Sequence, residues 1–164
     1  MLETIVFSLF NGVLYGMLLF MLASGLTLIF SLMGVLNFAH ASFFMLGAYF
    51  AYQISGFIGF WPGLIFAPLI VGGIGAAIER YGLRPVHKFG HVAELLFTFG
   101  LAFVIEEVVQ MIWGKVPVPY DIPESLNVAA FTWRELDYSA YRLFMLGVSV
   151  AIFIALFLFI AKTR

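Results

Sequence analysis

The sequence predicts an all-α membrane protein, a polytopic transmembrane helix bundle of about five membrane segments. Of its 164 residues, 63 % are hydrophobic and only 10 % are charged, with a mean hydropathy of +1.08, whereas a typical soluble domain has about 25 % charged residues. No Asp, Glu, Lys or Arg lies between Glu3 and Glu79. Since one membrane-spanning helix needs only about 20 apolar residues, several spans must follow one another in that run.

Glycines, prolines and charges divide the apolar run into three predicted spans. The first covers residues 4–32, about 43 Å at about 1.5 Å per residue, which exceeds a hydrocarbon core of about 30 Å. We expect it to be retained, because "MLETIVFSLFNG" lacks the basic leader of a signal peptide. The second covers residues 33–55 and ends at "SGFIGFWPG", a turn pattern. The third covers residues 62–83.

Two further spans follow the first charged loop, "RYGLRPVHKFGHVAE". One is "LLFTFGLAFVIEEVVQMIWG" and the other covers residues 141–161. Residues 115–138, between them, are too polar for lipid and form an exposed connection. Residues 80–88 and the C-terminus hold more Lys and Arg than this opposite connection. The positive-inside rule therefore places Arg84 and Arg164 on the cytoplasmic side.

Polar side chains interrupt the second predicted span. Asn37 and His40 are three residues apart, so on a helix they share a face, and neither tolerates hydrocarbon without a polar partner. Ser42, Tyr49 and Gln53 form a second polar stripe. Such stripes are typical of a helix that lines a pathway, but interhelical hydrogen bonds that serve only packing explain them as well. A zinc or catalytic role for His40 is disfavoured, because no second His or Cys lies at ligand spacing.

Two carboxylates, Glu106 and Glu107, lie inside the fourth predicted span. By helical rise they are about 10 Å from the span's end, and Gln110 extends the same polar patch. Carboxylates within a membrane usually face a bundle interior or a wet cavity, which makes these residues candidates for a solute path. The alternative is that one of them is protonated or paired with a base on a neighbouring helix or subunit.

The sequence also argues against several kinds of chemistry. It contains no cysteine, hence no disulfide and no thiolate metal site, and a net charge of −1 argues against nucleic acid as a partner. Walker A, dinucleotide-binding and Ser-His-Asp patterns are missing from the sequence. We therefore expect no cofactor, no metal and no catalytic residue, and energy for uphill transport must come from another subunit.

The stretch "NGVLYGMLLFMLASGLTLIFSLMGVLNFAHASFFMLGAYFAY" resembles the N-terminal signature of the permease subunits of branched-chain amino acid ABC transporters, the binding-protein-dependent importers of bacteria. "ERYGLRPV" and "FTFGLAF…WG" fit the same family. Ser31, Ala41 and Ser42 depart from it, standing where the family usually has Gly, Gly and an acid, and the missing acid would change the accepted substrate. Because family members are nearly twice as long, we expect residues 1–164 to be a single transmembrane permease domain, incomplete at its C-terminus. The matching positions are Gly25, Leu26, Thr27, Leu28, Ile29, Phe30, Met33, Gly34, Asn37, Phe38, Ala39, His40 and "MLGAY" from Met45.

The resemblance implies a transport subunit in the bacterial cytoplasmic (inner) membrane rather than an enzyme. Its implied partners are a second permease subunit, two cytoplasmic ATPase subunits and an extracytoplasmic solute-binding protein. The solute path would run between the permease subunits, which strengthens the pathway interpretation of Asn37 and His40. The connection at residues 115–138 is the candidate contact for the binding protein, unless it is only a solvated connection. Its acidic residues are Asp121, Glu124, Glu135 and Asp137.

Two other functions compete with transport. One is a non-transporting membrane fragment or scaffold, whose helices only assemble with partners. The other is an intramembrane enzyme that uses His40, Glu106 and Glu107. Acid–base chemistry of that kind requires these groups to lie within about 3 Å of each other, or one water apart.

Overall fold

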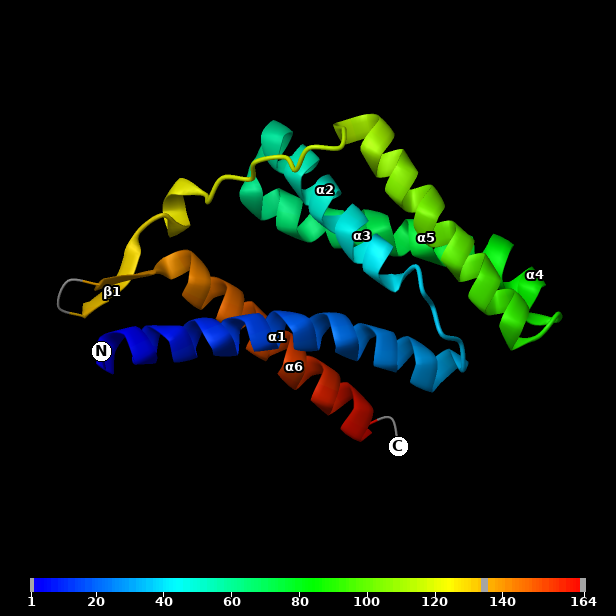
Figure 1. Ribbon diagram of the computed structural model, residues 1–164, viewed down its shortest axis with the longest axis horizontal. Coiled ribbons are helices and arrows are strands. Elements are labelled where there is room, and N and C mark those ends of the chain that lie inside the picture. The colour runs from blue at the N-terminus through cyan, green and yellow to red at the C-terminus, as the bar shows by residue number, and fades with distance from the viewer. Residues whose placement is uncertain (1, 134–135, 163–164) are drawn as a thin grey trace. The chain divides into compact units, whose positions relative to one another are not determined.

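The computed structural model describes residues 2–133 and 136–162. Five of its helices are long and apolar enough to cross a membrane, which confirms the predicted fold class: the chain is a multi-pass membrane protein. The chain divides into two compact units, which we call the central unit (Gly25–Tyr120) and the terminal unit (Met1–Ser24 with Asp121–Arg164). The five helices are α1 (Leu2–Met33), α2 (His40–Ile58), α3 (Phe60–Ile78), α5 (His91–Trp113) and α6 (Ala140–Lys162) (Figure 1).

A tight helical hairpin, α2 and α3, forms the centre of the central unit. Gly59 alone joins the two helices, and its φ of +98° lies in the left-handed region that favours glycine. Close packing continues at Gly63, where a Cβ atom would collide with the side chain of Ser55 and lie 3.0 Å from the carbonyl oxygen of Ala51. Because Gly63 has no side chain, α2 and α3 can pack closely at this position.

Helix α5 packs against α2 and completes the core of the central unit. The buried core consists of Ala39 and Leu46 from the α2 side and Ile105 and Val109 from α5. Because Ile105 and Val109 are four residues apart, they lie on one face of α5. That face contacts α2, and the opposite face of α5 is exposed.

Helix α3 continues into a wider turn, the π-helical segment η1 (Glu79–Leu83), and then into α4 (Arg84–His87). Gly82 allows this turn to approach α5, since a Cβ atom there would lie 2.5 Å from Cζ of Phe97. The end of α4 is tied to α5 by Glu94, which lies on α5 and is only 1 % exposed. The carboxylate of Glu94 contacts Nδ1 of His87 and lies 3.2 Å from Nδ1 of His91.

The second predicted span begins later than expected: the sequence predicts residues 33–55, whereas α2 covers His40–Ile58. The reason is local backbone chemistry. Gly34 adopts a φ of +69°, which ends α1, and the side-chain oxygen of Asn37 accepts a hydrogen bond of 3.0 Å from the backbone N–H of Ala39. This turn keeps residues 34–39 out of both helices.

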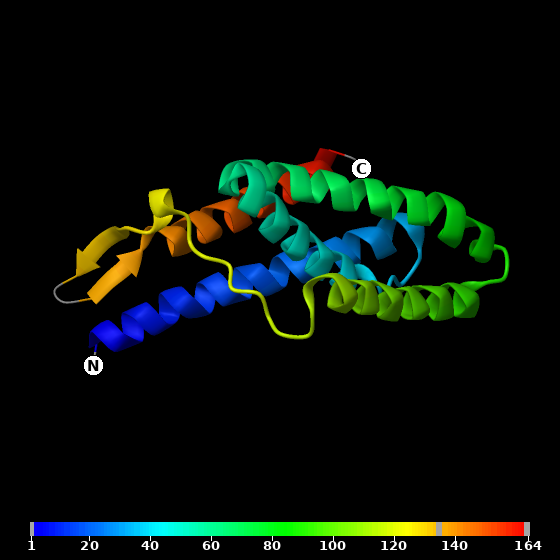
Figure 2. The same ribbon diagram turned by 90° about the horizontal axis from the view of Figure 1, so that it is seen from above.

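The polar connection before the last span is more ordered than the sequence predicted. It contains a short 3₁₀ turn, η2 (Glu124–Leu126), and an antiparallel hairpin of β1 (Ala129–Trp133) and β2 (Leu136–Ser139). In Figure 2 the hairpin leads directly into α6. Of the four acids predicted to meet a binding protein, Asp121 and Glu124 are exposed, whereas Glu135 and the side chain of Asp137 lie outside the described residues.

Aromatic and polar side chains hold the terminal unit together. The ring of Tyr138, at the end of the hairpin, lies 5.7 Å from that of Phe7 and 5.6 Å from that of Phe10 on α1. Nη1 of Arg142 on α6 donates a hydrogen bond of 2.8 Å to the side-chain oxygen of Asn11. These contacts join the N-terminal part of α1 to the hairpin and to the start of α6.

Candidate functional site

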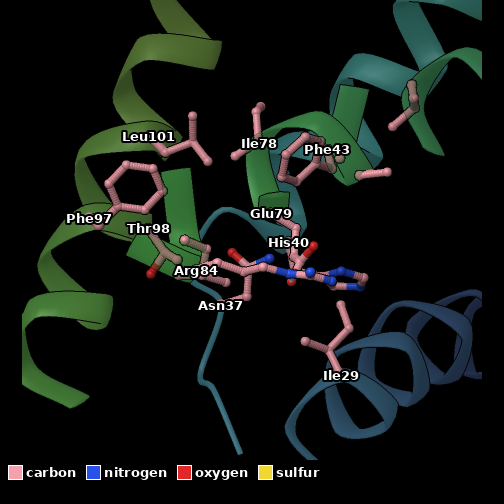
Figure 3. A pocket seen from close by; sticks show the side chains of 14 residues that line it. Ile29, Asn37, His40, Phe43, Ile78, Glu79, Arg84, Phe97, Thr98 and Leu101 are labelled. Atoms are coloured by element: carbon pink, nitrogen blue, oxygen red, sulfur yellow. Dashed lines mark hydrogen bonds and ion pairs between the residues drawn. The ribbon is translucent and has the colours of Figure 1, made fainter. Parts of the chain in front are cut away.

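A cavity of about 610 Å³ lies in the central unit, where the connection between α1 and α2 meets α3, η1 and α5. Figure 3 shows side chains that reach it from each of these stretches of chain. Its volume lies within the range of about 300–1,000 Å³ that is typical of small-molecule sites. Most of the wall is apolar, and the polar groups are few. The lining consists of Ile29, Asn37, His40, Phe43, Val71, Gly75, Ala76, Ile78, Glu79, Leu83, Arg84, Phe97, Thr98 and Leu101.

Asn37 and His40, the first predicted pair, both line this cavity. The sequence predicted that the two residues share one face of a helix, but Asn37 is not on a helix. It lies in the turn before α2, and His40 is the first residue of α2. The imidazole of His40 also lies close to α1: a Cβ atom on Gly25 would be 2.9 Å from its Cε1 and Nε2 atoms.

Thr98 is a polar lining residue that the sequence does not reveal. It is 1 % exposed, and its Oγ1 accepts a hydrogen bond of 3.3 Å from the backbone N–H of Phe38. The same hydroxyl lies 3.2 Å from the carbonyl oxygen of Leu95 and 3.4 Å from that of Leu36, which serve as its acceptors. Thr98 therefore attaches the connection between α1 and α2 to α5. A single Thr within an apolar helix is common and gives no signal in the sequence.

An ion pair also borders the cavity and was not predicted as part of a site. Nε of Arg84 donates a hydrogen bond of 2.7 Å to Oε1 of Glu79. Charges at the end of a span usually mark the membrane interface, so the sequence alone suggests no further role. The π-helical turn between the two residues brings them into the cavity lining.

The second predicted stripe, Ser42, Tyr49 and Gln53, does not line this cavity. Tyr49 and Gln53 instead meet the end of α5: the ring of Tyr49 lies 5.1 Å from that of Trp113, and Nε1 of Trp113 donates a hydrogen bond of 3.0 Å to Oε1 of Gln53. Ser42 is half-buried on α2, outside the lining. Tyr49 and Gln53 thus make an interhelical contact of the kind that stabilises packing, and the predicted part of this stripe in a solute path stays a prediction.

Glu106 and Glu107 are both exposed on α5, and Glu107 lies opposite Ile105 and Val109. As expected from the spacing, Nε2 of Gln110 donates to Oε1 of Glu106, at 3.3 Å. Neither carboxylate lines the cavity, so the predicted part of these residues in a solute path stays a prediction.

The three residues of the competing enzyme interpretation do not share this cavity. His40 lines the cavity, whereas Glu106 and Glu107 lie outside its lining. Across residues 2–133 and 136–162, no three His, Asp or Glu side chains come together in a way that could hold a metal ion. The cavity is large enough to hold a small molecule and lined so that it can offer hydrogen bonds, opposite charges and an apolar wall.

Comparison with known proteins identifies a family for the chain. The family described as "Branched-chain amino acid transport system / permease component" matches residues 8–164. The high-affinity branched-chain amino acid transport system permease protein LivH of Escherichia coli is 26 % identical over 142 residues, which are 80 % of this chain and 46 % of that protein. No solved structure matches the chain.

Two other relatives cover more of the chain. The permease protein BraD of Pseudomonas aeruginosa is 22 % identical over 95 % of this chain and 55 % of its own length. A protein described as the probable branched-chain amino acid transport permease LivH of Methanocaldococcus jannaschii is 30 % identical over 94 % of this chain and 50 % of its own length. The chain spans about half the length of these curated relatives. Since the family match covers nearly all of it, this membrane protein belongs to the permease components of branched-chain amino acid transport systems.

Proposed function

We propose that the chain is a transmembrane permease subunit of an ABC importer for branched-chain amino acids or related small polar solutes. In this proposal the cavity at Asn37 and His40 forms part of the translocation pathway. One observation carries it: in a member of this permease family, a mostly apolar cavity lies at a break between two membrane helices. Transporters often bind solutes where helices are interrupted, because unwound backbone offers polar groups there.

The proposal includes partners and a location. A second permease subunit would complete the pathway, two cytoplasmic ATPase subunits would supply energy, and an extracytoplasmic solute-binding protein would deliver the solute. The complex would lie in the bacterial cytoplasmic membrane. Residues 115–138, with exposed Asp121 and Glu124, are the proposed contact for the binding protein. Membership in the permease family supports these partners. The exposed carboxylates of Asp121 and Glu124 would complement a basic surface on the binding protein.

The test is uptake of radiolabelled leucine by cells that lack their own high-affinity uptake and express this chain with the other subunits of its transport system. We expect Asn37→Leu and His40→Leu to abolish uptake while the amount of chain in the membrane stays the same. Gln53→Leu is the matched control. It also removes a polar group from α2, but its side chain contacts Trp113 outside the cavity.

We expect Gln53→Leu to retain uptake. Unchanged uptake in both cavity variants would assign Asn37 and His40 to packing. If cells that express the unsubstituted chain show no uptake even with every partner present, the chain is a non-transporting fragment or scaffold instead.

A further inference from the structure

The Glu79–Arg84 ion pair is the one charged feature of the cavity lining that the pathway proposal leaves without a role. Both side chains are accessible: 69 % of Arg84 and 27 % of Glu79 are exposed. The contact uses only the N–H on Nε of Arg84, so other donors of the planar guanidinium are available for a second carboxylate. A solute in the cavity would thus meet a carboxylate and a guanidinium side by side.

The backbone fixes this arrangement. In the π-helical turn η1, the backbone N–H of Arg84 donates to the carbonyl oxygen of Glu79, five residues earlier. The wider turn brings the two side chains together on one side of the segment, where a regular α-helix would separate them. Turns of this kind are rare and often occur at functional sites. Leu83, which is buried, and Gly82, which packs against Phe97, hold the turn against α5.

Most of the rest of the lining is apolar, and its other polar residues are Asn37, His40 and Thr98. Phe43, Val71, Ile78 and Leu101 present only hydrocarbon (Figure 3). The cavity therefore combines one acidic and one basic group with an apolar wall. A free α-amino acid with a hydrocarbon side chain has the complementary set of groups: an ammonium, a carboxylate and an apolar chain.

We propose that Glu79 binds the ammonium group and Arg84 binds the carboxylate of a zwitterionic α-amino acid whose apolar side chain lies against Phe43, Ile78 and Leu101. The exchange is balanced in charge, because one ion pair within the protein is replaced by two between protein and solute. An exposed ion pair adds little stability, so opening it costs little. Arg binds a carboxylate through two parallel hydrogen bonds, which are stronger than contacts between neutral groups. This inference rests on the proposed function, since it takes the solute to be an amino acid.

The test measures which groups of the solute each residue recognises. The full chain is reconstituted in lipid nanodiscs, and binding of radiolabelled leucine is competed with three unlabelled ligands. These are leucine, 4-methylpentanoate, which lacks the ammonium group, and 3-methylbutylamine, which lacks the carboxylate. We expect leucine to compete at least about tenfold better than either partial analogue, as one strong charged contact provides.

The variants then separate the two contacts. In Glu79→Gln, leucine should lose its advantage over 4-methylpentanoate, because the ammonium group no longer finds a carboxylate. In Arg84→Gln, leucine should lose its advantage over 3-methylbutylamine. Arg80→Gln is the matched control: it removes a charge from the same turn, but Arg80 does not line the cavity, and the ranking of the three ligands should be unchanged.

Three results would overturn the assignment: no saturable leucine binding to the wild-type chain, an unchanged ranking in both variants, or an equal loss for all three ligands. Circular dichroism and gel filtration of each variant show whether it is folded. A variant that fails to fold is replaced by Glu79→Asp or Arg84→Lys, which keep the charge and should keep the order of preference. The uptake test with Asn37→Leu and His40→Leu is independent, so transport can be upheld while the role of the ion pair is rejected.

Discussion

Asn37 contributes both to the turn before α2 and to the cavity lining. A substitution that removes its whole amide group therefore affects both. Its side-chain oxygen closes the turn before α2 by accepting from the N–H of Ala39, and its side chain also lines the cavity. Asn37→Asp keeps an oxygen for the turn but removes the amide donor, whereas Asn37→Leu removes both. The two variants therefore separate the structural role from the proposed solute-binding role.

We expect Asn37→Leu to lower the free energy of unfolding by about 0.5–1.5 kcal/mol, the contribution of one hydrogen bond. Asn37→Asp should unfold close to the wild-type temperature in detergent, yet its leucine uptake should fall strongly. Thermal unfolding followed by circular dichroism, together with uptake, checks both expectations. Full uptake by Asn37→Asp would mean that the residue serves only the turn.

Gly25 controls the position of the His40 ring. Since a Cβ atom there would lie 2.9 Å from the ring, Gly25→Ala must displace the imidazole, which costs about 0.5–1.5 kcal/mol when a side chain leaves its preferred rotamer. We expect leucine affinity to fall by about two- to tenfold. The measurement is leucine binding in nanodiscs.

Gly12→Ala is the control for Gly25→Ala. Gly12 lies on the same helix, and within the described chain nothing approaches its Cβ position within 4 Å. Binding should remain at the wild-type level. Equal losses in both variants would show that α1 responds to added volume in general rather than to the contact with His40.

At the scale of elements, Gly82 determines how closely η1 approaches α5. Gly82→Ala would place a methyl group 2.5 Å from the ring of Phe97, and overpacking of this kind typically costs about 1–3 kcal/mol. We expect a lower unfolding temperature in detergent. Gly72→Ala, on α3, should have no such effect, since the described structure leaves open space there. Gly82→Ala combined with Phe97→Leu should recover part of the loss.

Helix α5 presents two different faces, and substitutions should distinguish them. Ile105→Ala removes part of the core shared with α2 and should destabilise the chain by about 2–5 kcal/mol. Glu106→Gln, on the exposed face, should leave unfolding of the isolated chain unchanged. If Glu106 faces a partner subunit, the same variant should reduce co-purification with the second permease. Equal stability of both variants would contradict this division of α5.

The sequence allowed prediction of the helices but not of their ends or of the cavity. Hydropathy identifies spans because lipid demands a long apolar segment, and all five predicted spans are present. The start of α2 depends on the positive φ of Gly34 and on the Asn37 turn, which hydropathy does not detect. Glu79 and Arg84 both line the cavity because a π-helical turn brings them together. The amino-acid composition of this segment does not distinguish a π-helical turn from an α-helical one. The β1–β2 hairpin was missed because its strands are short and lie within a polar connection.

At the scale of the whole molecule, the number of spans and the distribution of charge make separate predictions. One span, α5, separates the loop after α4 from the connection that contains η2, so these two regions must lie on opposite sides of the membrane. The excess of Lys and Arg in residues 80–88 and at the C-terminus predicts that the loop after α4 faces the cytoplasm. Because the chain contains no cysteine, a single introduced thiol reports the side on which it lies.

We expect Glu124→Cys to react with a membrane-impermeant maleimide in intact spheroplasts, and Lys88→Cys to react only after the membrane is permeabilised. The cysteine-free parent should remain unlabelled in both conditions. Labelling of both thiols from the same side would contradict a membrane crossing by α5. The reverse pattern would keep the five spans but invert the orientation. In that case the connection would face the cytoplasm and could not meet an extracytoplasmic binding protein, so this measurement also tests that contact.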